Sequence, residues 1–309
     1  MQEFRMAIVR TPLRYPGGKS SLSAFLRSVF EENGLQDITY VEPFAGGAGA
    51  AINLLIEGHV NRIVLNDVNP AIYKFWRSVV EHTDEFLQKL YETPISIDEW
   101  NTQKKIFSNI SEYSDIEVGF ATFYLNRCNH SGILTANPIG GINQTGKWKI
   151  DARYKKESLE NRIKNIAAHK DKISIHCLDA LTFIKDLSAN RQDNIFFYLD
   201  PPYYKKGSQL YLNAFMDKSH EELRNVLQDI ENVQWVLTYD NTPEILALYE
   251  NWCSVKEFSL NYFAFRAKVG AELLIYNKQL KLPPSGIKVK YGIATPLPHF
   301  LPDTSEQLA

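Results

Sequence analysis

The sequence predicts an α/β fold with a mostly parallel sheet, helices on both of its faces, an antiparallel C-terminal hairpin and an inserted module. Three observations support this prediction. Apolar segments repeatedly end in a polar residue and are followed by a helical pattern, which is typical of parallel strands joined by helices. Residues from about 81 to 155 interrupt the alternation. Two late strand patterns, Val255 to Tyr262 and Glu272 to Asn277, have no clear helix between them, which favours a hairpin at the sheet edge.

The first two predicted units each consist of a strand followed by a helix. Asp37 to Phe44 predicts a strand, Phe44-Ala45-Gly46-Gly47-Ala48-Gly49 a glycine-rich loop, and Ala50 to Ile56 a helix of small and apolar residues. Arg62 to Asp67 predicts a short buried strand that ends in a polar pair. A helix is expected from Pro70 to Val80, because proline fits the first helical position.

Residues 81–155 are predicted to form a module inserted into the sheet domain. The hydrophobic period weakens there, and Asn126 to Gly146 is rich in Asn, Gly, Ser and Thr, which indicates loops. A length of 309 residues, against roughly 150 per domain, also favours two domains or one domain with a large insertion. We therefore expect residues 1–80 and 156–309 to form one discontinuous domain and residues 81–155 a mainly helical and loop-rich insertion.

Strand and helix patterns resume after the insertion. Strands are expected at Lys172 to His176, Ile195 to Leu199 and Trp235 to Tyr239. Each is followed closely by an aspartate, and these are Asp179, Asp200 and Asp240. Because ligands of open parallel sheets bind beyond the carboxyl ends of the strands, these carboxylates predict a site at that edge. Helices are expected at Leu181 to Leu187 and His220 to Ile230, and the proline-rich tail after Pro283 is expected to be irregular.

Composition excludes several classes of protein. With 44% apolar and 23% charged residues, the chain matches an average globular protein, not a disordered or fibrous one. No apolar run approaches about 18 residues and no apolar segment follows the N-terminus, so neither a membrane span nor a secretory signal is expected. An intracellular location is the default. Three cysteines, Cys128, Cys177 and Cys253, lie far apart and support neither a disulfide framework nor a thiolate zinc site.

Charge is segregated along the chain although its sum is only −2. Lys147 to Lys172 holds nine Lys or Arg against four Asp or Glu, and residues 1–30 hold five against one. Such basic stretches either line a surface that faces phosphates or are solvated faces of helices and loops. Both interpretations stay open at this level.

The glycine-rich loop and the aspartate after the second strand form a candidate ligand site. Backbone N–H groups of a loop between strand and helix can approach a nucleotide-like ligand, which makes Phe44, Gly46 and Gly49 candidates. The loop fits neither the G-x-G-x-x-G dinucleotide pattern nor a P-loop. Asp67 stands where an acidic residue commonly binds ribose hydroxyls. A tight packing turn at the glycines and an Asx turn at Asp67 are the alternatives.

The tetrapeptide Asp200-Pro201-Pro202-Tyr203, directly after a predicted strand, is a more specific signal. Two prolines remove two N–H donors and fix φ, so the turn is rigid and presents carbonyl oxygens. A planar, amino-bearing base can give one N–H to Asp200 and another to the Pro201 carbonyl while its ring lies on Tyr203. The alternative is a strand that ends in prolines and is followed by a core tyrosine.

Taken together, these motifs resemble the Dam-type, D12 class of DNA adenine-N6 methyltransferases. The matching residues are Arg14-Tyr15-Pro16-Gly17-Gly18-Lys19, Glu42 to Gly49, Asn66-Asp67, Asp179 and Asp200-Pro201-Pro202-Tyr203. The stretch from Leu125-Asn126-Arg127 through Gly132 to Asn137-Pro138-Ile139-Gly140-Gly141 is similar to the target-recognition segment of the family, and Tyr154-Lys155-Lys156 to its exit. The resemblance covers nearly the whole chain. It implies the Rossmann-like sheet of the methyltransferases that use S-adenosyl-L-methionine (AdoMet).

The resemblance assigns AdoMet as the cofactor and gives individual residues a role. Tyr15 and Lys19 match the aromatic residue and the lysine that contact the methionine portion of AdoMet. Asp67 would hold its ribose and Asp179 its adenine amino group. Asp200 would lie between the cofactor and the target base. Arg14 matches a basic position that reaches a target base in some relatives, where lysine is more usual.

The implied reaction is site-specific methyl transfer from AdoMet to N6 of an adenine in double-stranded DNA. The amino lone pair is delocalised into the ring, so acceptors at Asp200 and Pro201 would draw it out of conjugation and align it with the methyl group. The chemistry requires no metal. Because the target atom is inaccessible inside a duplex, the base must be flipped, and Tyr203 would recover some of the lost stacking.

Four other functions stay open on the sequence. A cytosine-N4 methyltransferase more often has Ser in place of Asp200, and a protein-glutamine methyltransferase typically has Asn there, so Asp favours adenine. An RNA-adenine methyltransferase fits the large insertion less well than duplex readout does. A DNA-binding regulator without activity is disfavoured because Lys19, Asp67, Asp200 and Tyr203 are all present.

Double-stranded DNA is the expected partner, without a membrane or a metal. The candidates for DNA contact are Arg14, Asn126, Arg127, His130, Asn137, Pro138, Arg153, Lys155 and Lys156. For the base-reading candidates Asn126, Arg127, His130, Asn137 and Arg153, the alternative is a role in turn structure or phosphate contact only. We expect a monomer in the cytoplasm, associated with the nucleoid of a prokaryotic host or with phage DNA. The sequence specifies neither the recognised DNA site nor a cognate restriction endonuclease.

Overall fold

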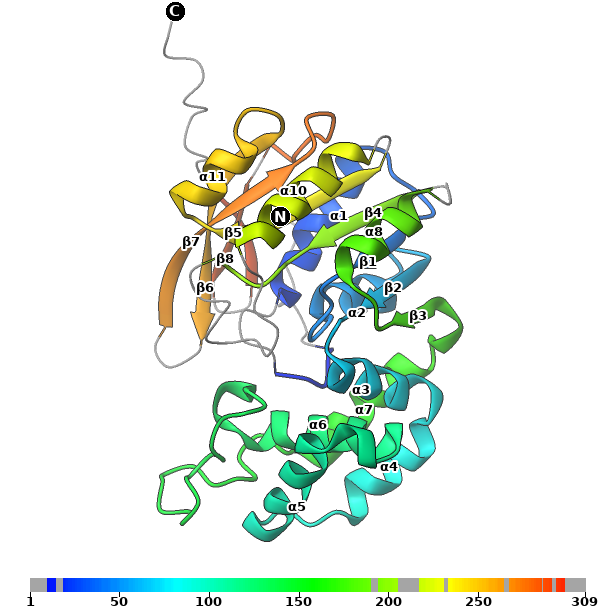
Figure 1. Ribbon diagram of the computed structural model, residues 1–309, viewed down its shortest axis with the longest axis vertical. Helices are drawn as coiled ribbons and strands as arrows, with labels where there is room; N and C mark the ends of the chain where they lie inside the picture. Colours follow the sequence, from blue (N-terminus) through cyan, green and yellow to red (C-terminus); the bar gives the residue numbers. More distant parts are fainter. Residues whose placement is uncertain are drawn as a thin grey trace, which may run out of the picture.

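The computed structural model describes residues 10–14, 19–189, 194–204, 217–230, 233–263, 267–284, 286–290 and 293–297 of the 309-residue chain. A sheet flanked by helices forms one part of the molecule, and a group of helices with a long loop region lies below it in Figure 1. Tyr15, predicted to contact the cofactor, and residues 16–18 of the same motif lie outside the described residues.

The main sheet has seven strands in the order β3-β2-β1-β4-β5-β7-β6. Their bounds are β1 (Thr39–Glu42), β2 (Arg62–Asn66), β3 (Ile173–His176), β4 (Ile195–Leu199), β5 (Gln234–Asp240), β6 (Ser254–Phe263) and β7 (Ala267–Tyr276). The pairs from β3 to β5 are parallel, whereas β7 is antiparallel to both β5 and β6. The predicted mostly parallel sheet with an antiparallel hairpin at its edge is confirmed.

The central strands are buried on both sides because helices cover both faces of the sheet. Neighbouring residues of one strand point to opposite faces, so Tyr40 belongs to one core cluster and Val41 to the other. Phe196 and Phe197 of β4 divide in the same way, and the Tyr40 and Phe196 rings stack with their centroids 6.3 Å apart. This double burial explains why β4 is a continuous apolar run in the sequence.

Helices from both ends of the chain form the two covering layers. The first core cluster includes side chains of α1 (Ser23–Glu32), α2 (Gly49–Ile56), α3 (Pro70–Glu81) and α7 (Lys156–Ala167). The second includes side chains of α8 (Ala180–Ala189), α10 (Asp217–Asp229) and α11 (Pro243–Tyr249). As predicted, α3 begins at Pro70, and the Asn69 side chain caps it by accepting a hydrogen bond from the Ala71 N–H at 3.0 Å.

The interrupting segment forms α4 (Thr83–Glu92), α5 (Ile97–Ser108) and α6 (Asp115–Cys128). Ser114 and Glu117 form a capping box at the start of α6. Every residue from Val118 to Cys128 is buried, which explains why the sequence shows a weak helical period there: a helix buried all round has no polar face. Phe86 of α4 contacts Phe75 of α3 and Phe123 of α6, with ring centroids 6.0 and 5.3 Å apart.

Two further features complete the described chain. Residues 129–155 contain one short 3-10 helix, η3 (His130–Gly132), and otherwise turns, as the Asn- and Gly-rich composition predicts. The expectation of an irregular tail after Pro283 is wrong for β8 (Gly286–Lys290) and β9 (Ile293–Leu297), which pair as an antiparallel hairpin. The sequence alternates β-branched Ile287 and Val289 with lysines, and this pattern favours a strand despite the prolines nearby. Within the described ranges, every helix is too short or too polar to span a bilayer.

Candidate active site

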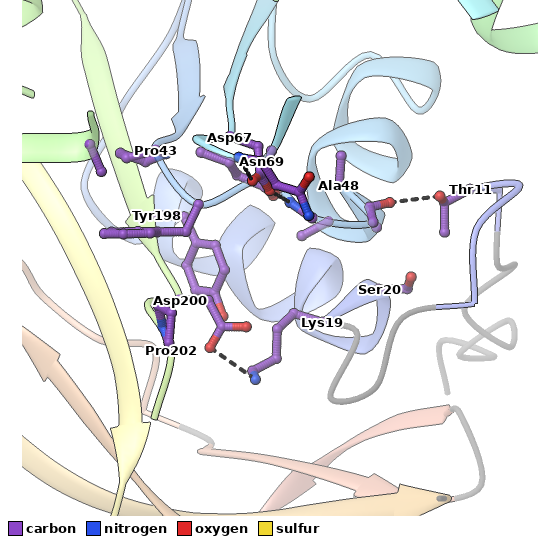
Figure 2. Close-up of a pocket in the computed structure, with 18 of the residues that line it drawn as sticks. Thr11, Lys19, Ser20, Pro43, Ala48, Asp67, Asn69, Tyr198, Asp200 and Pro202 are labelled. Carbon is purple, nitrogen blue, oxygen red and sulfur yellow. Dashed lines mark hydrogen bonds and ion pairs between the residues drawn. The ribbon is translucent and has the colours of Figure 1, made fainter. Parts of the chain in front are cut away.

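A cleft opens at the carboxyl ends of β1, β2 and β4. Its walls come from residues 42–50 at the end of β1 and after it, from Asp67 to Asn69 after β2, from Tyr198 of β4, from Asp200 and Pro202 after β4, and from Lys19 and Ser20. Figure 2 shows Asp67 and Asn69 at one end of this cleft and Lys19 and Asp200 pointing toward one another at the other. The structure therefore brings together the three separate motifs that the sequence singled out.

The glycine-rich loop is held from several sides. Gly46 and Ala48 have φ values of 45° and 44°, in the left-handed region. Glycine adopts this conformation without a steric cost, which explains its presence at position 46. The Gly46 carbonyl accepts a hydrogen bond from Trp76 Nε1 at 2.9 Å, and the Gly47 carbonyl accepts one from Thr11 Oγ1 at 2.6 Å. At Gly49 a Cβ atom would lie 2.2 Å from Ser20 Oγ, so glycine permits the close approach of the N-terminal segment.

Asp67 combines the two roles that the sequence left open. Its Oδ1 accepts a hydrogen bond from the Asn69 N–H at 2.9 Å, which is the Asx turn, and its Oδ2 accepts one from the Gly46 N–H at 2.9 Å. Burial raises the pKa of Asp67 to about 6 although both backbone bonds act in the opposite direction. Because a carboxylate oxygen can accept more than one hydrogen bond, the Asx turn leaves Asp67 able to bind a ligand hydroxyl.

Glu42 is a buried carboxyl in the wall of the cleft to which the sequence gave no role. Its Oε1 accepts hydrogen bonds from the Tyr40 hydroxyl and from the Ala51 N–H, both at 3.1 Å. Burial raises the pKa of Glu42 to about 8. The side chain therefore holds its proton at neutral pH and ties β1 to the first turn of α2.

We predict that Glu42→Gln makes the free energy of unfolding less dependent on pH. In the wild-type protein the unfolded chain is ionised above about pH 4.5 while folded Glu42 keeps its proton to about pH 8. Raising the pH through this window therefore destabilises the folded state, by up to about 1.4 kcal/mol per unit. Urea unfolding at pH 6, 7 and 8 should show the variant gaining stability relative to wild type. A constant difference would contradict the raised pKa.

The tetrapeptide at the end of β4 places Asp200 beside two donors. Asp200 Oδ1 lies 3.0 Å from Lys19 Nζ and accepts a hydrogen bond from Thr238 Oγ1 at 2.9 Å. No described residue donates to Oδ2. Pro201 is buried, and Pro202 lines the cleft. Asp200 thus has one oxygen fixed by the protein and one available as an acceptor for a ligand.

Tyr203 makes polar contacts that its expected role as a stacking platform does not include. Its hydroxyl accepts a hydrogen bond from Lys19 Nζ at 2.7 Å and donates a short one to Glu272 Oε1. The Lys19 ammonium also lies 5.1 Å from the centroid of the Tyr203 ring. Burial raises the pKa of Tyr203 well above its ordinary value, and the Asp200 carboxylate adds to this effect. The hydroxyl therefore keeps its proton.

Glu272 of β7 is the residue of this site that sequence reasoning missed. Its side chain is 2% exposed, and its Oε2 lies 3.8 Å from Lys19 Nζ. In the sheet Glu272 stands directly opposite Asp240 of β5. Two acidic residues directly opposite each other in a sheet are unfavourable, so this pairing indicates a candidate functional residue. It can be recognised only when the strand register is known.

Asp179 lies at the exposed start of α8. Its Oδ1 accepts hydrogen bonds from the Thr182 N–H at 2.9 Å and the Thr182 hydroxyl at 3.0 Å, which is the geometry of a helix cap. Between β2 and this segment, buried Asn66 bonds the carbonyls of Pro43 and Leu178 at 3.0 and 3.1 Å. Asn66, which precedes Asp67, thus ties the glycine-rich loop to the loop that leads to Asp179.

A second, basic pocket lies beside the N-terminal segment. We define it by its lining residues, which are Arg14, His130, Ser131, Ile139, Gly140, Gly146, Lys147, Trp148, Ala152 and Arg153. Arg14 links it to the fold, since its Nη1 donates to the Asn129 carbonyl at 3.2 Å. The Trp148 side chain is exposed at 66% and has Lys147 Nζ 5.8 Å from its ring centroid. Trp148 carried no signal in the sequence.

Asn126 and Arg127, predicted to contact DNA, are turned into the protein. Asn126 is 1% exposed and bonds both backbone groups of Arg14, at 2.7 and 2.8 Å. Arg127 Nε donates to the Arg153 carbonyl at 2.8 Å. Burial, together with the neighbouring Arg14 and Arg162, lowers the pKa of Arg127 to about 9. Both side chains therefore hydrogen-bond the backbone of residues that line the basic pocket, and in this conformation they do not present their polar groups to solvent.

The remaining predicted DNA contacts differ in exposure. The side chains of Asn137, Arg153 and Lys155 are exposed, whereas Pro138 is buried. Lys156, at the start of α7, donates to the Tyr91 carbonyl at 2.7 Å. The long loop region therefore presents some of the predicted residues outward and uses the others to fix its own shape.

The fold and the cleft define a class of protein. A glycine-rich loop after β1, an aspartate after β2 and Asp-Pro-Pro-Tyr after β4 surround one cleft, which is the arrangement of an AdoMet-dependent methyltransferase that acts on an amino group. The chain belongs to the family of D12 class N6 adenine-specific DNA methyltransferases, whose family model matches residues 15–262. It is accordingly an adenine-specific DNA methyltransferase with AdoMet as cofactor, and the family predicted from the sequence motifs is confirmed.

Two solved structures are similar to this chain at low sequence identity. Among solved structures, a Pyrococcus horikoshii protein assigned as an RNA methyltransferase is 10% identical with a TM-score of 0.38, covering 89% of each chain. An rRNA methyltransferase, AviRa from Streptomyces viridochromogenes, is 13% identical with a TM-score of 0.36, covering 86% of this chain and 88% of the other. These likenesses are too low to indicate a substrate. A comparison with curated protein sequences gives no match.

Proposed function

We propose that this enzyme transfers a methyl group from AdoMet to N6 of an adenine that is flipped out of double-stranded DNA at a specific site. The observation that carries the proposal is Asp200 Oδ2 in the wall of the cleft, which accepts no hydrogen bond from the described residues and is followed by a rigid Pro-Pro turn. Residues 1–80 and 156–309 would bind the cofactor and hold the catalytic groups. Residues 81–155 would read the DNA.

The small and polar side chains that line the described cleft suit AdoMet as a ligand. Gly46, Gly49 and Phe44 form a wall of small residues and one aromatic ring, and Asp67 offers carboxylate oxygens to ribose hydroxyls. Lys19 brings a cation to the end of the cleft near Asp200, where it would meet the carboxylate of the methionine portion. Asp179, at the rim, would accept the adenine amino group. When bound, AdoMet supplies an electrophilic methyl group on a sulfonium.

The catalytic contribution of the chain is to position and polarise the target amino group. Asp200 Oδ2 and the Pro201 carbonyl would each accept one N–H of the adenine, which directs the nitrogen lone pair away from the ring. Pro202 keeps this turn rigid because its φ is fixed. Preorganised acceptors of this kind act in a site that excludes water, where they are most effective. The Tyr203 ring would lie against the flipped base.

The basic pocket and the exposed loop residues are the proposed DNA-facing surface. Arg14 and Arg153 line the pocket, and buried Arg127 lies close enough that the charges of both, with burial as the larger cause, lower its pKa. DNA phosphates would relieve this repulsion. Trp148, exposed next to a lysine, suits stacking on DNA bases. Asn137 and Arg153 are exposed where they can reach base edges or phosphates.

Arg153→Gln and Lys155→Gln are expected to weaken binding to all DNA sequences alike. Removing one phosphate contact should also lower the slope of log affinity against log salt by about 1. Fluorescence anisotropy with a labelled duplex at several salt concentrations measures both quantities. Lys185→Gln is the matched control, because Lys185 is exposed on α8, which covers the sheet. Unchanged slopes in both test variants would make the basic stretch a solvated face.

Product analysis tests the proposed function directly. The purified enzyme and labelled AdoMet are incubated with double-stranded DNA, single-stranded DNA and RNA, and the nucleosides are separated by mass. We expect N6-methyldeoxyadenosine from duplex DNA, confined to one sequence context when the product is sequenced. N6-methyladenosine from RNA, or N4-methylcytosine from DNA, would replace the proposal with one of the functions that the sequence left open.

A further inference from the structure

Glu272 is a buried acid that completes a chain of contacts beginning at the catalytic aspartate. Asp200 Oδ1 lies 3.0 Å from Lys19 Nζ, and Lys19 donates to the Tyr203 hydroxyl at 2.7 Å. The Tyr203 hydroxyl in turn donates to Glu272 Oε1. Each contact joins groups that can exchange a proton, so the four side chains form a continuous path from the cleft to β7.

The charges of this group do not balance when both carboxyls are ionised. Lys19 is the cation that Asp200 and Glu272 share, at 3.0 and 3.8 Å. Among the residues that the structure describes, one positive and two negative groups leave a surplus negative charge, and Lys19 and Glu272 are only 6% and 2% exposed. The sulfonium of AdoMet would neutralise that surplus before the reaction, but the thioether left afterwards would not.

The chemistry of the proposed function releases one proton at this place. The amino nitrogen bonds to the methyl carbon with its lone pair, the electron pair of the carbon–sulfur bond stays with sulfur, and the nitrogen loses one proton. The positive charge that the cofactor gives up thus reappears as a proton. If that proton remains within the four side chains, their charge rises by one as the charge of the cofactor falls by one, so the sum of the two is the same before and after methyl transfer.

We propose that Glu272 takes up the proton that the adenine amino group loses, by way of Asp200, Lys19 and Tyr203; the proposal rests on the proposed function. The proton passes from the amino nitrogen to Asp200 Oδ2, and the protonated carboxyl group then turns to present it to Lys19 Nζ, which lies beside Oδ1. Lys19 then accepts the proton from Asp200 and gives one to the Tyr203 oxygen, while Tyr203 gives its own to Glu272. Asp200, Lys19 and Tyr203 end as they began, and Glu272 ends protonated.

The surroundings make Glu272 a better terminal acceptor than Asp200. The ionised form of Asp200 is held by Lys19 and by the Thr238 hydroxyl. Glu272 Oε2 is buried and accepts no hydrogen bond from the described residues. Burial raises the pKa of Glu272 to about 7; Lys19 opposes this shift, Asp200 and Asp240 add to it, and the Tyr203 bond opposes it. Tyr198, whose own pKa Glu272 helps to raise, is the other titratable neighbour.

Calorimetry of ligand binding tests this assignment without any turnover. At pH 7, binding of AdoMet should release protons from Glu272, because the sulfonium favours the ionised carboxyl. Binding of the neutral product S-adenosylhomocysteine should not. Titrations in two buffers of different ionisation enthalpy give the number of protons released. Glu272→Gln should abolish the difference between the two ligands, and Glu257→Gln, an exposed glutamate on β6, should keep it.

Single-turnover methylation as a function of pH provides the second test. We expect the wild-type rate to rise between about pH 6 and 8 as Glu272 ionises, and Glu272→Gln to lower the rate by about 10² and to flatten the profile. A merely structural role would lower the rate but leave the shape of the profile unchanged. Tyr203→Phe interrupts the path while retaining the acid, so it should slow the reaction and keep the difference in proton release.

The outcomes separate this proposal from the proposed function. If Glu272→Gln keeps both the wild-type proton release and the wild-type pH profile, the assignment of Glu272 is overturned. A folded wild-type enzyme that methylates no duplex DNA would overturn the proposed function instead, and the two-buffer titrations would still report on the charge of Glu272. Circular dichroism of each variant confirms that it is folded before either measurement is interpreted.

Discussion

Asp200→Asn is expected to lower the single-turnover rate of methyl transfer by about 10²–10³, the usual effect of losing one preorganised electrostatic contact. The substitution keeps the shape of the side chain but replaces an anionic acceptor with a neutral amide. The amide can turn its NH₂ toward the target amino group, where two donors would then face each other. Polarisation of the adenine nitrogen is lost, so the rate should fall even when cofactor and DNA are saturating.

Specific DNA binding should persist in Asp200→Asn, because Asp200 lies in the cleft and not on the exposed loop region. Gel-shift or anisotropy measurements with cognate and scrambled duplexes supply that control. Thr238→Val is the matched variant: it removes the hydrogen bond to Asp200 Oδ1 but leaves the carboxylate in place. Its rate should lie between those of wild type and Asp200→Asn. Near-normal turnover by Asp200→Asn would remove Asp200 from the catalytic role.

The sheet was predictable from the sequence because its signals are local. Each central strand is buried on both faces, so it appears as a short apolar run, and β4 is the clearest case. The ends of two strands are also recognisable in the sequence, because Asp67 and Asp200 directly follow β2 and β4. Parallel neighbours bring such ends to one edge, which is why separate motifs could be assigned to one cleft without coordinates.

The exposure of the residues proposed to face DNA was less predictable, because a helix that is buried all round has no periodic signal. Asn126 and Arg127 stand in the segment similar to the target-recognition region, yet α6 is buried around its whole circumference at that point. Their polar groups consequently bond the backbone of Arg14 and Arg153. Trp148 shows the reverse case, since this large aromatic residue, to which the sequence gave no role, is exposed at 66%.

Glu272 could not be found from the sequence because its position depends on two long-range pairings. It lies beside Lys19 and Tyr203 only because β7 pairs with β5 in the antiparallel direction, which sets Glu272 opposite Asp240. Lys19, from the other end of the chain, must then approach within 3.8 Å. Neither the strand pairing nor the approach of Lys19 produces a recognisable pattern in the sequence around Glu272. Sequence motifs identified Asp200, the group proposed to face the substrate, whereas the charged residues around it could be found only from the structure.

Lys19→Met is expected to have the second large effect, on stability and on cofactor affinity together. Lys19 is 6% exposed and is the cation beside both Asp200 and Glu272, so its removal leaves two carboxyls without a counter-charge. Breaking a buried ion pair by removing one partner costs about 3–5 kcal/mol. We expect a loss of that order at pH 8, measured by urea unfolding, and a lower affinity for AdoMet in calorimetry.

The pH dependence of this loss identifies its origin. Folded Glu272 has a pKa of about 7, and removing the ammonium of Lys19 raises that pKa further. Below pH 7 Glu272 is largely protonated in both proteins, so the stability difference should be smaller at pH 6 and grow as the pH rises through 7. The double variant Lys19→Met/Glu272→Gln should recover much of the stability at pH 8 without recovering affinity for AdoMet. A loss that is independent of pH, or a double variant no more stable than Lys19→Met, would show that Lys19 acts by packing and not as the shared counter-charge.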